Sequence, residues 1–145
     1  MSTADFAEAH AGKKPGDRIQ CLVVTPEKTI IDEMVDFVAV PLHDGELGLL
    51  PGRSPVIGRL GYGELRTKVG DQVRSYFVDR GFVQVRDDVV TVLTNRAIPA
   101  AAIDAGSAKA ELAKAQALRA VGDLDQADRE RAIGRARALV HVATK

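Results

Sequence analysis

The chain has 145 residues, and its 20 basic residues balance its 20 acidic residues, so the formal net charge is zero. A chain of this length holds one ordinary domain, or a small domain with an appendage, and its balanced charge argues against a nucleic-acid-binding surface over the whole chain. The single cysteine, Cys21, excludes an internal disulfide framework, and no apolar run approaches the roughly 20 residues that a membrane-spanning helix needs.

The N-terminal segment from Met1 to Arg18 is expected to form a flexible extension. It is polar and mixed in charge, with the run Lys13–Gly16 near its end. It lacks the apolar stretch of a signal peptide, and Asp5, Glu8 and Asp17 argue against an acid-poor organelle transit sequence.

From Ile19 to Ile98 the sequence breaks into short runs of aliphatic, β-branched and aromatic residues separated by Gly, Pro and Asp. Such runs are typical of an antiparallel β-sandwich or barrel. The turn residues Gly70-Asp71-Gln72, Arg80-Gly81 and Asp87-Asp88 predict hairpins. The expected strands are Ile19–Thr25, Thr29–Val35, Phe37–Pro41, Val56–Leu60, Glu64–Val69, Val73–Asp79, Phe82–Arg86 and Val89–Thr94.

Two glycine-containing segments have competing interpretations. Gly61-Tyr62-Gly63 is interpreted as a turn, because it lacks the third glycine of a phosphate-binding loop and falls between expected strands. The longer segment His43–Pro55 has an apolar centre among glycines and prolines, and is expected to be a long connection. It is either a loop built for contact with a partner or a crossover between the two sheets.

After Pro99 the sequence becomes rich in Ala, Leu, Lys, Arg and Glu, which predicts helices. Gly122-Asp123 divides this region into two expected antiparallel helices, Ile103–Val121 and Asp125–Ala143. The second has an apolar stripe, and Arg131 and Arg135 are expected on the opposite face. Few large aliphatic residues offset the entropy lost on ordering the hairpin, so it is expected to lie on another surface and to be movable.

The sequence assembles no catalytic or metal site. The histidines His10, His43 and His141 lack metal-ligand spacing, and Cys21 is expected to be a buried small hydrophobe. The pair Asp87-Asp88 is expected to be solvated. A small β-fold enzyme is one conceivable class of function, but no nucleophile and base pair supports it.

The segment Asp44–Gly48, followed by Pro51–Pro55, resembles the epsilon subunit of F-type ATP synthases. The segments Val23–Glu27, Gly81–Val85 and Val90–Thr94 also look like that family at corresponding places. The likeness runs from Ile19 to the C-terminus, so the first eighteen residues are an extra extension. The loop motif is specific, whereas the Ala-rich helices would match many hairpins.

The resemblance implies an α+β chain with an N-terminal antiparallel β-sandwich docking domain over residues 19–98 and a two-helix hairpin over residues 99–145. It implies a non-catalytic rotor subunit of a proton-translocating complex, peripheral on the cytoplasmic face of the bacterial inner membrane. The implied partners are the gamma subunit, the membrane c-ring and the catalytic head, with membrane contact only through the complex. The alternative is a free-standing regulatory or ligand-binding β-sandwich with a helical tail.

The resemblance also implies partner-facing residues in the loop. One group is expected to face the c-ring, and a second group to face gamma or the ring. The first group is Asp44, Gly45 and Glu46, and the second is Arg53, Ser54 and Pro55.

In this family the helical tail can extend into the catalytic head and inhibit ATP hydrolysis. The basic residues of the second helix are the candidates for contacting acidic segments of the head. A solvated basic face is the other interpretation of these residues, which are Arg129, Arg131, Arg135 and Arg137.

One departure from the family concerns nucleotide binding. Some epsilon subunits bind ATP through a motif of Ile or Leu, Asp, two variable residues, Arg and Ala. Here the corresponding residues are Ile103, Asp104, Ser107 and Ala108, with Ser107 in place of the arginine. Without the guanidinium a phosphate loses its planar partner, so weak or no ATP binding is expected and no cofactor is predicted.

Overall fold

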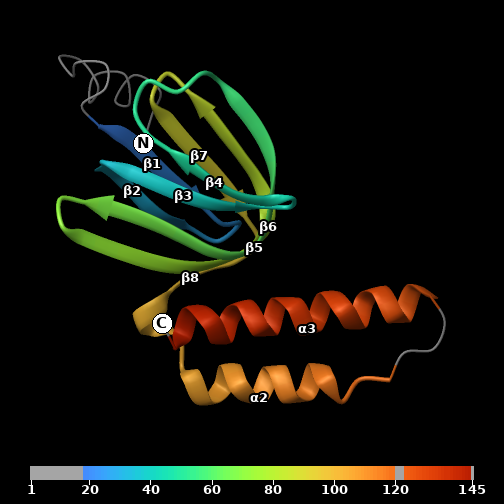
Figure 1. The fold of residues 1–145 in the computed structure, drawn as a ribbon. Coiled ribbons are helices and arrows are strands. Elements are labelled where there is room, and N and C mark those ends of the chain that lie inside the picture. The colour runs from blue at the N-terminus through green and yellow to red at the C-terminus, as the bar shows by residue number, and fades with distance from the viewer. Residues whose placement is uncertain (1–17, 120–122, 145) are drawn as a thin grey trace.

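The computed structural model describes residues 18–119 and 123–144, and it has the predicted α+β fold (Figure 1). The expected N-terminal extension and the helix stop at Gly122 lie outside these residues, apart from Arg18. Within them the chain forms a β-domain followed by two helices. The elements are β1 (Ile19–Val24), β2 (Thr29–Val35), β3 (Phe37–Leu42), β4 (Gly45–Leu49), β5 (Val56–Val69), β6 (Gln72–Arg86), β7 (Val89–Thr94), β8 (Ala97–Pro99), a 3-10 helix η1 (Ala100–Ala102), α2 (Ala105–Gln116) and α3 (Asp123–Ala143).

The strands follow the order β2-β1-β7-β6-β5-β3-β4, with β8 pairing beside them on β6. Among the described strand pairs only β1 and β7 run parallel, and the strands β2 to β6 that separate them in the chain provide the long crossover that a parallel pair needs. One buried cluster contains Ile31 of β2, Val40 of β3 and Leu65 of β5. Strands from distant parts of the order therefore share a core, and the sheet folds over on itself.

Strands β5 and β6 are each continuous where the sequence predicts turns at Gly61–Gly63 and Arg80-Gly81. Their ladder keeps one register from Val56↔Val85 to Val69↔Gln72, and only the pair of Gly61 with Arg80 is missing along it. Arg80 (φ 54°) and Gly81 (φ 136°) have positive φ values. Both turn predictions are wrong, because the positive φ values at Arg80 and Gly81 are accommodated within the strand without a shift of its register.

The segment His43–Pro55 is also more regular than the predicted connection. It contains β4, which pairs with β3 through Val40↔Leu47 and Leu42↔Gly45. Gly48 lies within β4, where an added Cβ would come 3.1 Å from Cε2 of the Phe37 ring. Gly48, one of the glycines that suggest a loop, therefore lies in a strand, at a position where an aromatic ring leaves little room for a side chain.

Helix α2 is shorter than the predicted Ile103–Val121, and α3 begins at Asp123 rather than Asp125. Helix α3 lies between the β-domain and α2 (Figure 1), in contact with β5, β6 and α2. Phe77 of β6 is buried with Leu139 and Val142 of α3. The hairpin thus lies on the β-domain, as its small number of large aliphatic residues predicts. No helix in the described part of the chain is both long and apolar enough to cross a membrane.

Candidate functional site

The predicted ring-facing residues form the exposed tip of the β3–β4 hairpin. Asp44, Gly45 and Glu46 are all exposed, and Gly45 has a φ of 140° that favours glycine. The Glu46 carboxylate accepts a hydrogen bond from a guanidinium nitrogen of Arg66 at 2.5 Å. Part of the acidic charge at this tip is therefore balanced within the chain, whereas Asp44 makes no ion pair with the described residues.

The second predicted group lies at the opposite end of β4, on the connection to β5. Arg53, Ser54 and Pro55 are exposed there. The backbone nitrogen of Gly52, which has a φ of 84°, donates a hydrogen bond of 2.7 Å to the carboxylate of Asp88, at the β6–β7 turn. This bond tethers the connection to a neighbouring turn.

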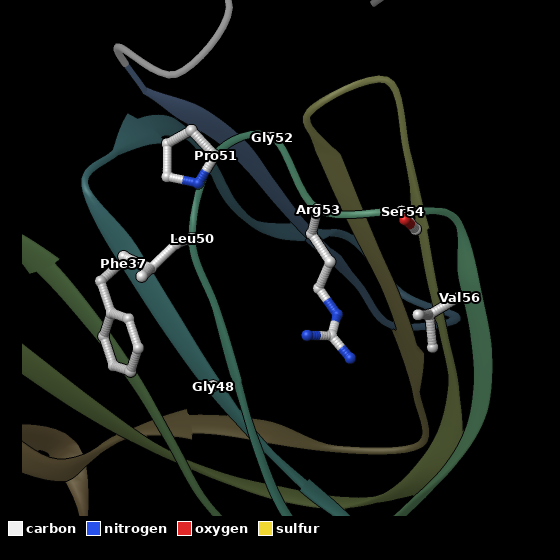
Figure 2. Close-up of a pocket in the computed structure, with 8 residues that line it drawn as sticks. All are labelled: Phe37, Gly48, Leu50, Pro51, Gly52, Arg53, Ser54 and Val56. Carbon is white, nitrogen blue, oxygen red and sulfur yellow. The ribbon is translucent and has the colours of Figure 1, made fainter.

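Beside this connection is a hollow of about 490 Å³. Figure 2 shows the Arg53 side chain extending from the connection into the space between Phe37 and Val56. The wall is mainly apolar and carries one cation, the guanidinium of Arg53. The lining residues are Phe37, Gly48, Leu50, Pro51, Gly52, Arg53, Ser54 and Val56.

The β-domain also has an apolar patch, formed by Ile57, Phe82 and Leu93, that the sequence does not reveal as a site. These side chains are 79%, 59% and 52% exposed. Phe82 pairs directly with Leu93 and with Arg59, and Ile57 precedes Arg59 by two residues, so all three side chains share one face of β5, β6 and β7. The alternation of residues in β6 is one sequence signal for this patch, because it places Phe82 on the same side of the strand as the polar Gln84 and therefore on the exposed side.

The four arginines of α3 have different environments. Arg129 donates hydrogen bonds to the carbonyl oxygens of Leu118, at 2.8 Å, and Gln116, at 3.1 Å, just after and at the end of α2. Arg131 pairs with Asp128 on the same helix, and Arg137 is exposed. Arg129 therefore holds the two helices together.

Arg135 does not lie on the solvent face of α3, and that prediction is wrong. Its Nε is 3.0 Å from Oδ1 of Asp79 on β6, and the two side chains are only 24% and 13% exposed. The 3.6-residue pattern identifies one apolar stripe, but α3 has two covered faces. One faces α2 and the other faces the β-domain.

The degenerate nucleotide motif caps α2. The Asp104 carboxylate accepts hydrogen bonds from the backbone nitrogens of Gly106 and Ser107, at 3.2 and 3.3 Å, and from the Ser107 hydroxyl at 2.7 Å. The Ser107 hydroxyl first, and then these amides, lower the pKa of Asp104. Ala108 is buried, and Ile103 packs against the same apolar cluster. In the folded hairpin the motif residues thus cap α2 or pack in its apolar cluster.

The described residues contain no group of three or more His, Cys, Asp or Glu side chains that could hold a metal ion. Cys21 is buried, as predicted, and burial is the main cause that raises the pKa of its thiol to about 12. A thiol in this state is unreactive at neutral pH.

Comparisons with known proteins agree with the loop motif. Residues 18–100 match the model of the ATP synthase delta/epsilon chain β-sandwich domain. The ATP synthase epsilon chain of Rhodopirellula baltica is 57% identical over 97 residues, which cover 67% of this chain and 76% of that one. The epsilon chain of Solibacter usitatus is 40% identical over 131 residues, which cover 89% of this chain and 98% of that one.

The fold also matches a solved structure. A chain in the structure of the Euglena gracilis mitochondrial ATP synthase OSCP/F1/c-ring assembly superposes with a TM-score of 0.79 at 24% identity, over 93% of this chain and 86% of that one. This similarity concerns the fold alone, and it includes the helical hairpin as well as the β-domain. The family follows instead from the match over residues 18–100 and from the two epsilon chains. The chain belongs to the delta/epsilon-chain family of ATP synthases, as a non-catalytic epsilon subunit.

Proposed function

We propose that the chain is a central-stalk rotor subunit that couples rotation of the c-ring to ATP synthesis in a proton-translocating ATP synthase. The observation that carries this proposal is the exposed apolar patch of the β-domain. The acidic tip of the β3–β4 hairpin lies apart from this patch, so the domain offers two separate surfaces to partners. The subunit acts at the cytoplasmic face of the bacterial inner membrane, which it reaches through the complex.

The apolar patch is the docking face for the gamma subunit. Ile57, Phe82 and Leu93 are large hydrophobic side chains left more than half exposed, and burying each contributes about 1.5–3 kcal/mol. Contiguous exposed apolar side chains of this kind mark protein interfaces. Residues 53–55 lead into β5, the strand that carries Ile57, so this connection enters the strand close to the patch.

The acidic tip is the contact with the c-ring. Asp44 and Glu46 lie at the end of β4 opposite to Arg53, which favours two different partners for the two groups. Exposed ion pairs with basic ring loops contribute only about 0–1 kcal/mol each, so the shape of the hairpin must supply the rest of the contact.

Copurification of gamma with a tagged chain tests the docking face. Phe82→Glu and Leu93→Glu place a charge on the patch and should abolish gamma recovery. Val73→Glu is the matched control, because Val73 is 58% exposed on the same strand as Phe82 but at its other end. Equal recovery with all three variants would contradict the docking face, and a chain purified without gamma would favour a free-standing sandwich.

The helical hairpin is the inhibitory element. In the folded hairpin Arg129 and Arg135 are engaged within the chain, and extension would release both toward the acidic segments of the catalytic head. Truncation after Ala102 keeps β8 paired with β6 and should raise ATP hydrolysis by the complex. An unchanged hydrolysis rate would remove the inhibitory role.

ATP binding by the isolated subunit is weak or absent. Asp104 and Ser107 already satisfy each other at the start of α2, and Ser107 lacks the guanidinium that a phosphate would need. Millimolar ATP should therefore leave both the melting temperature and the amide chemical shifts of the isolated chain unchanged. A clear change in either would contradict this proposal.

A further inference from the structure

Gly134 lies in the interior of the 21-residue helix α3, where glycine weakens a helix relative to alanine. A Cβ at this position would come 3.0 Å from Cζ and 3.1 Å from Cε2 of Tyr62, and closer still to its hydroxyl. The tip of the Tyr62 ring therefore lies directly on the helix backbone. The Tyr62 ring occupies the space that a side chain at position 134 would fill.

The neighbouring residue of α3 makes the second contact with the same place on the β-domain. Arg135 pairs with Asp79, and Asp79 is the cross-strand partner of Tyr62 in the β5–β6 ladder. Two consecutive residues of the helix thus meet two directly paired residues of the sheet. This arrangement fixes both the position and the rotation of α3, because a shift by one residue would lose both contacts.

The rest of the interface shows why this point matters. A cavity of about 970 Å³ lies on the N-terminal side of the contact, with Asp128 and Arg131 of α3 and Arg59 and Arg80 of the β-domain among its lining residues. On the C-terminal side, Leu139 and Val142 are buried with Phe77. The Tyr62–Gly134 contact is therefore where close packing of α3 on the β-domain begins.

From this geometry we infer that Tyr62 and Gly134, with the Asp79–Arg135 pair beside them, form a latch that holds the hairpin in its folded state. A side chain at position 134 forces the ring out of its seat and separates α3 from β5. The latch rests on the proposed inhibitory function, since it sets how readily the hairpin leaves the β-domain.

The latch is tested by amide hydrogen exchange of the isolated full-length chain. Gly134→Ala should speed exchange at Ala136, Leu139 and Val142 by roughly tenfold or more, as expected for an overpacked contact. Gly106→Ala is the matched control, because an added Cβ there would meet only the Asp104 carboxylate, at 3.6 Å, and should leave exchange in α3 unchanged. Both substitutions favour helix formation, so faster exchange in Gly134→Ala alone reports lost docking.

A second variant tests the role of the ring. In a Tyr62→Ala background the obstacle to a Cβ is gone, so Gly134→Ala should add no further exchange. Two results would overturn the latch: native protection of α3 in Gly134→Ala, or an equal effect of Gly134→Ala with and without the Tyr62 ring.

Hydrolysis by the assembled complex separates the latch from the proposed function. Gly134→Ala that releases α3 in the isolated chain but leaves hydrolysis unchanged supports the latch and contradicts inhibition by the hairpin. Hydrolysis that rises after truncation at Ala102, while Gly134→Ala keeps α3 protected, supports inhibition and overturns the latch.

Discussion

The guanidinium of Arg66 on β5 bonds the carboxylate of Glu46 at the end of the β3–β4 hairpin, at 2.5 Å. The acidic tip proposed to face the c-ring therefore already has a cation from its own chain. A partner with basic loops must either displace Arg66 or bind beside the pair.

Because of this pair, reversing the charge of Glu46 should have two separate effects, one on assembly with the c-ring and one on the stability of the chain. Glu46→Lys should weaken assembly with the c-ring, and by setting a second cation beside Arg66 it should also lower stability by less than about 1 kcal/mol. Glu46→Gln is the matched variant, because it removes the carboxylate without adding a cation and leaves Arg66 beside the Glu64 carboxylate, at 3.5 Å. It should lower stability less than Glu46→Lys and still weaken recovery of the c-ring. If Glu46→Gln recovers the ring fully, the negative charge at position 46 does not support assembly.

Arg129 should stabilise the end of α2. Arg129→Met removes the donors to the carbonyl oxygens of Gln116 and Leu118, so the last turn of α2 should fray at a cost of roughly 1 kcal/mol. Amide exchange at Ala115 to Ala117 measures this effect. Arg137→Met is the control, because Arg137 is exposed on the same helix, and an equal effect of the two variants would contradict the assignment.

Acidification should loosen the start of α2. The pKa of Asp104 is lowered, chiefly by the Ser107 hydroxyl, so the folded state holds fewer protons than the unfolded state. The stabilisation is therefore complete above the unfolded pKa and is lost as the pH falls through the folded pKa, at pH values below roughly 4. An NMR titration should show the Ser107 amide shift moving with the Asp104 carboxyl, and Ser107→Ala should raise the pKa of Asp104.

Two phenylalanines on β6 should differ sharply in their contribution to stability. Phe77 is fully buried beneath the hairpin, so Phe77→Ala should cost about 3–5 kcal/mol of the free energy of unfolding. Phe82 is 59% exposed, so Phe82→Ala should change this free energy by only about 0.5 kcal/mol. Chemical denaturation of the isolated chain measures both values, and similar losses would contradict the assigned burial.

The sequence predicts the order and type of most elements because short β-branched runs and Ala-rich helices carry strong local signals. Its errors arise where one residue type serves two structures. Arg80-Gly81 has the residue types of a turn, but β6 continues through it in an unchanged register with positive φ values at both residues. Gly48 suggests a loop, but it lies in β4 and pairs with Ala39 of β3, where the Phe37 ring leaves little room for a side chain.

The candidate sites were less predictable, because they depend on contacts between distant segments. Periodicity places Arg135 opposite one apolar stripe, but only the packed structure shows that a second face of α3 meets Asp79. From the sequence, Gly134 only weakens a helix, whereas the structure shows that the Tyr62 ring packs where its side chain would be. The patch formed by Ile57, Phe82 and Leu93 requires the registers of three strands.

Cys21 has a practical consequence for all of these experiments. It is the only cysteine of the chain, and its buried thiol has a pKa of about 12. At neutral pH a cysteine introduced on the surface will be the single reactive thiol. The natural chain is therefore a ready background for attaching fluorophores or spin labels to the hairpin and the β-domain.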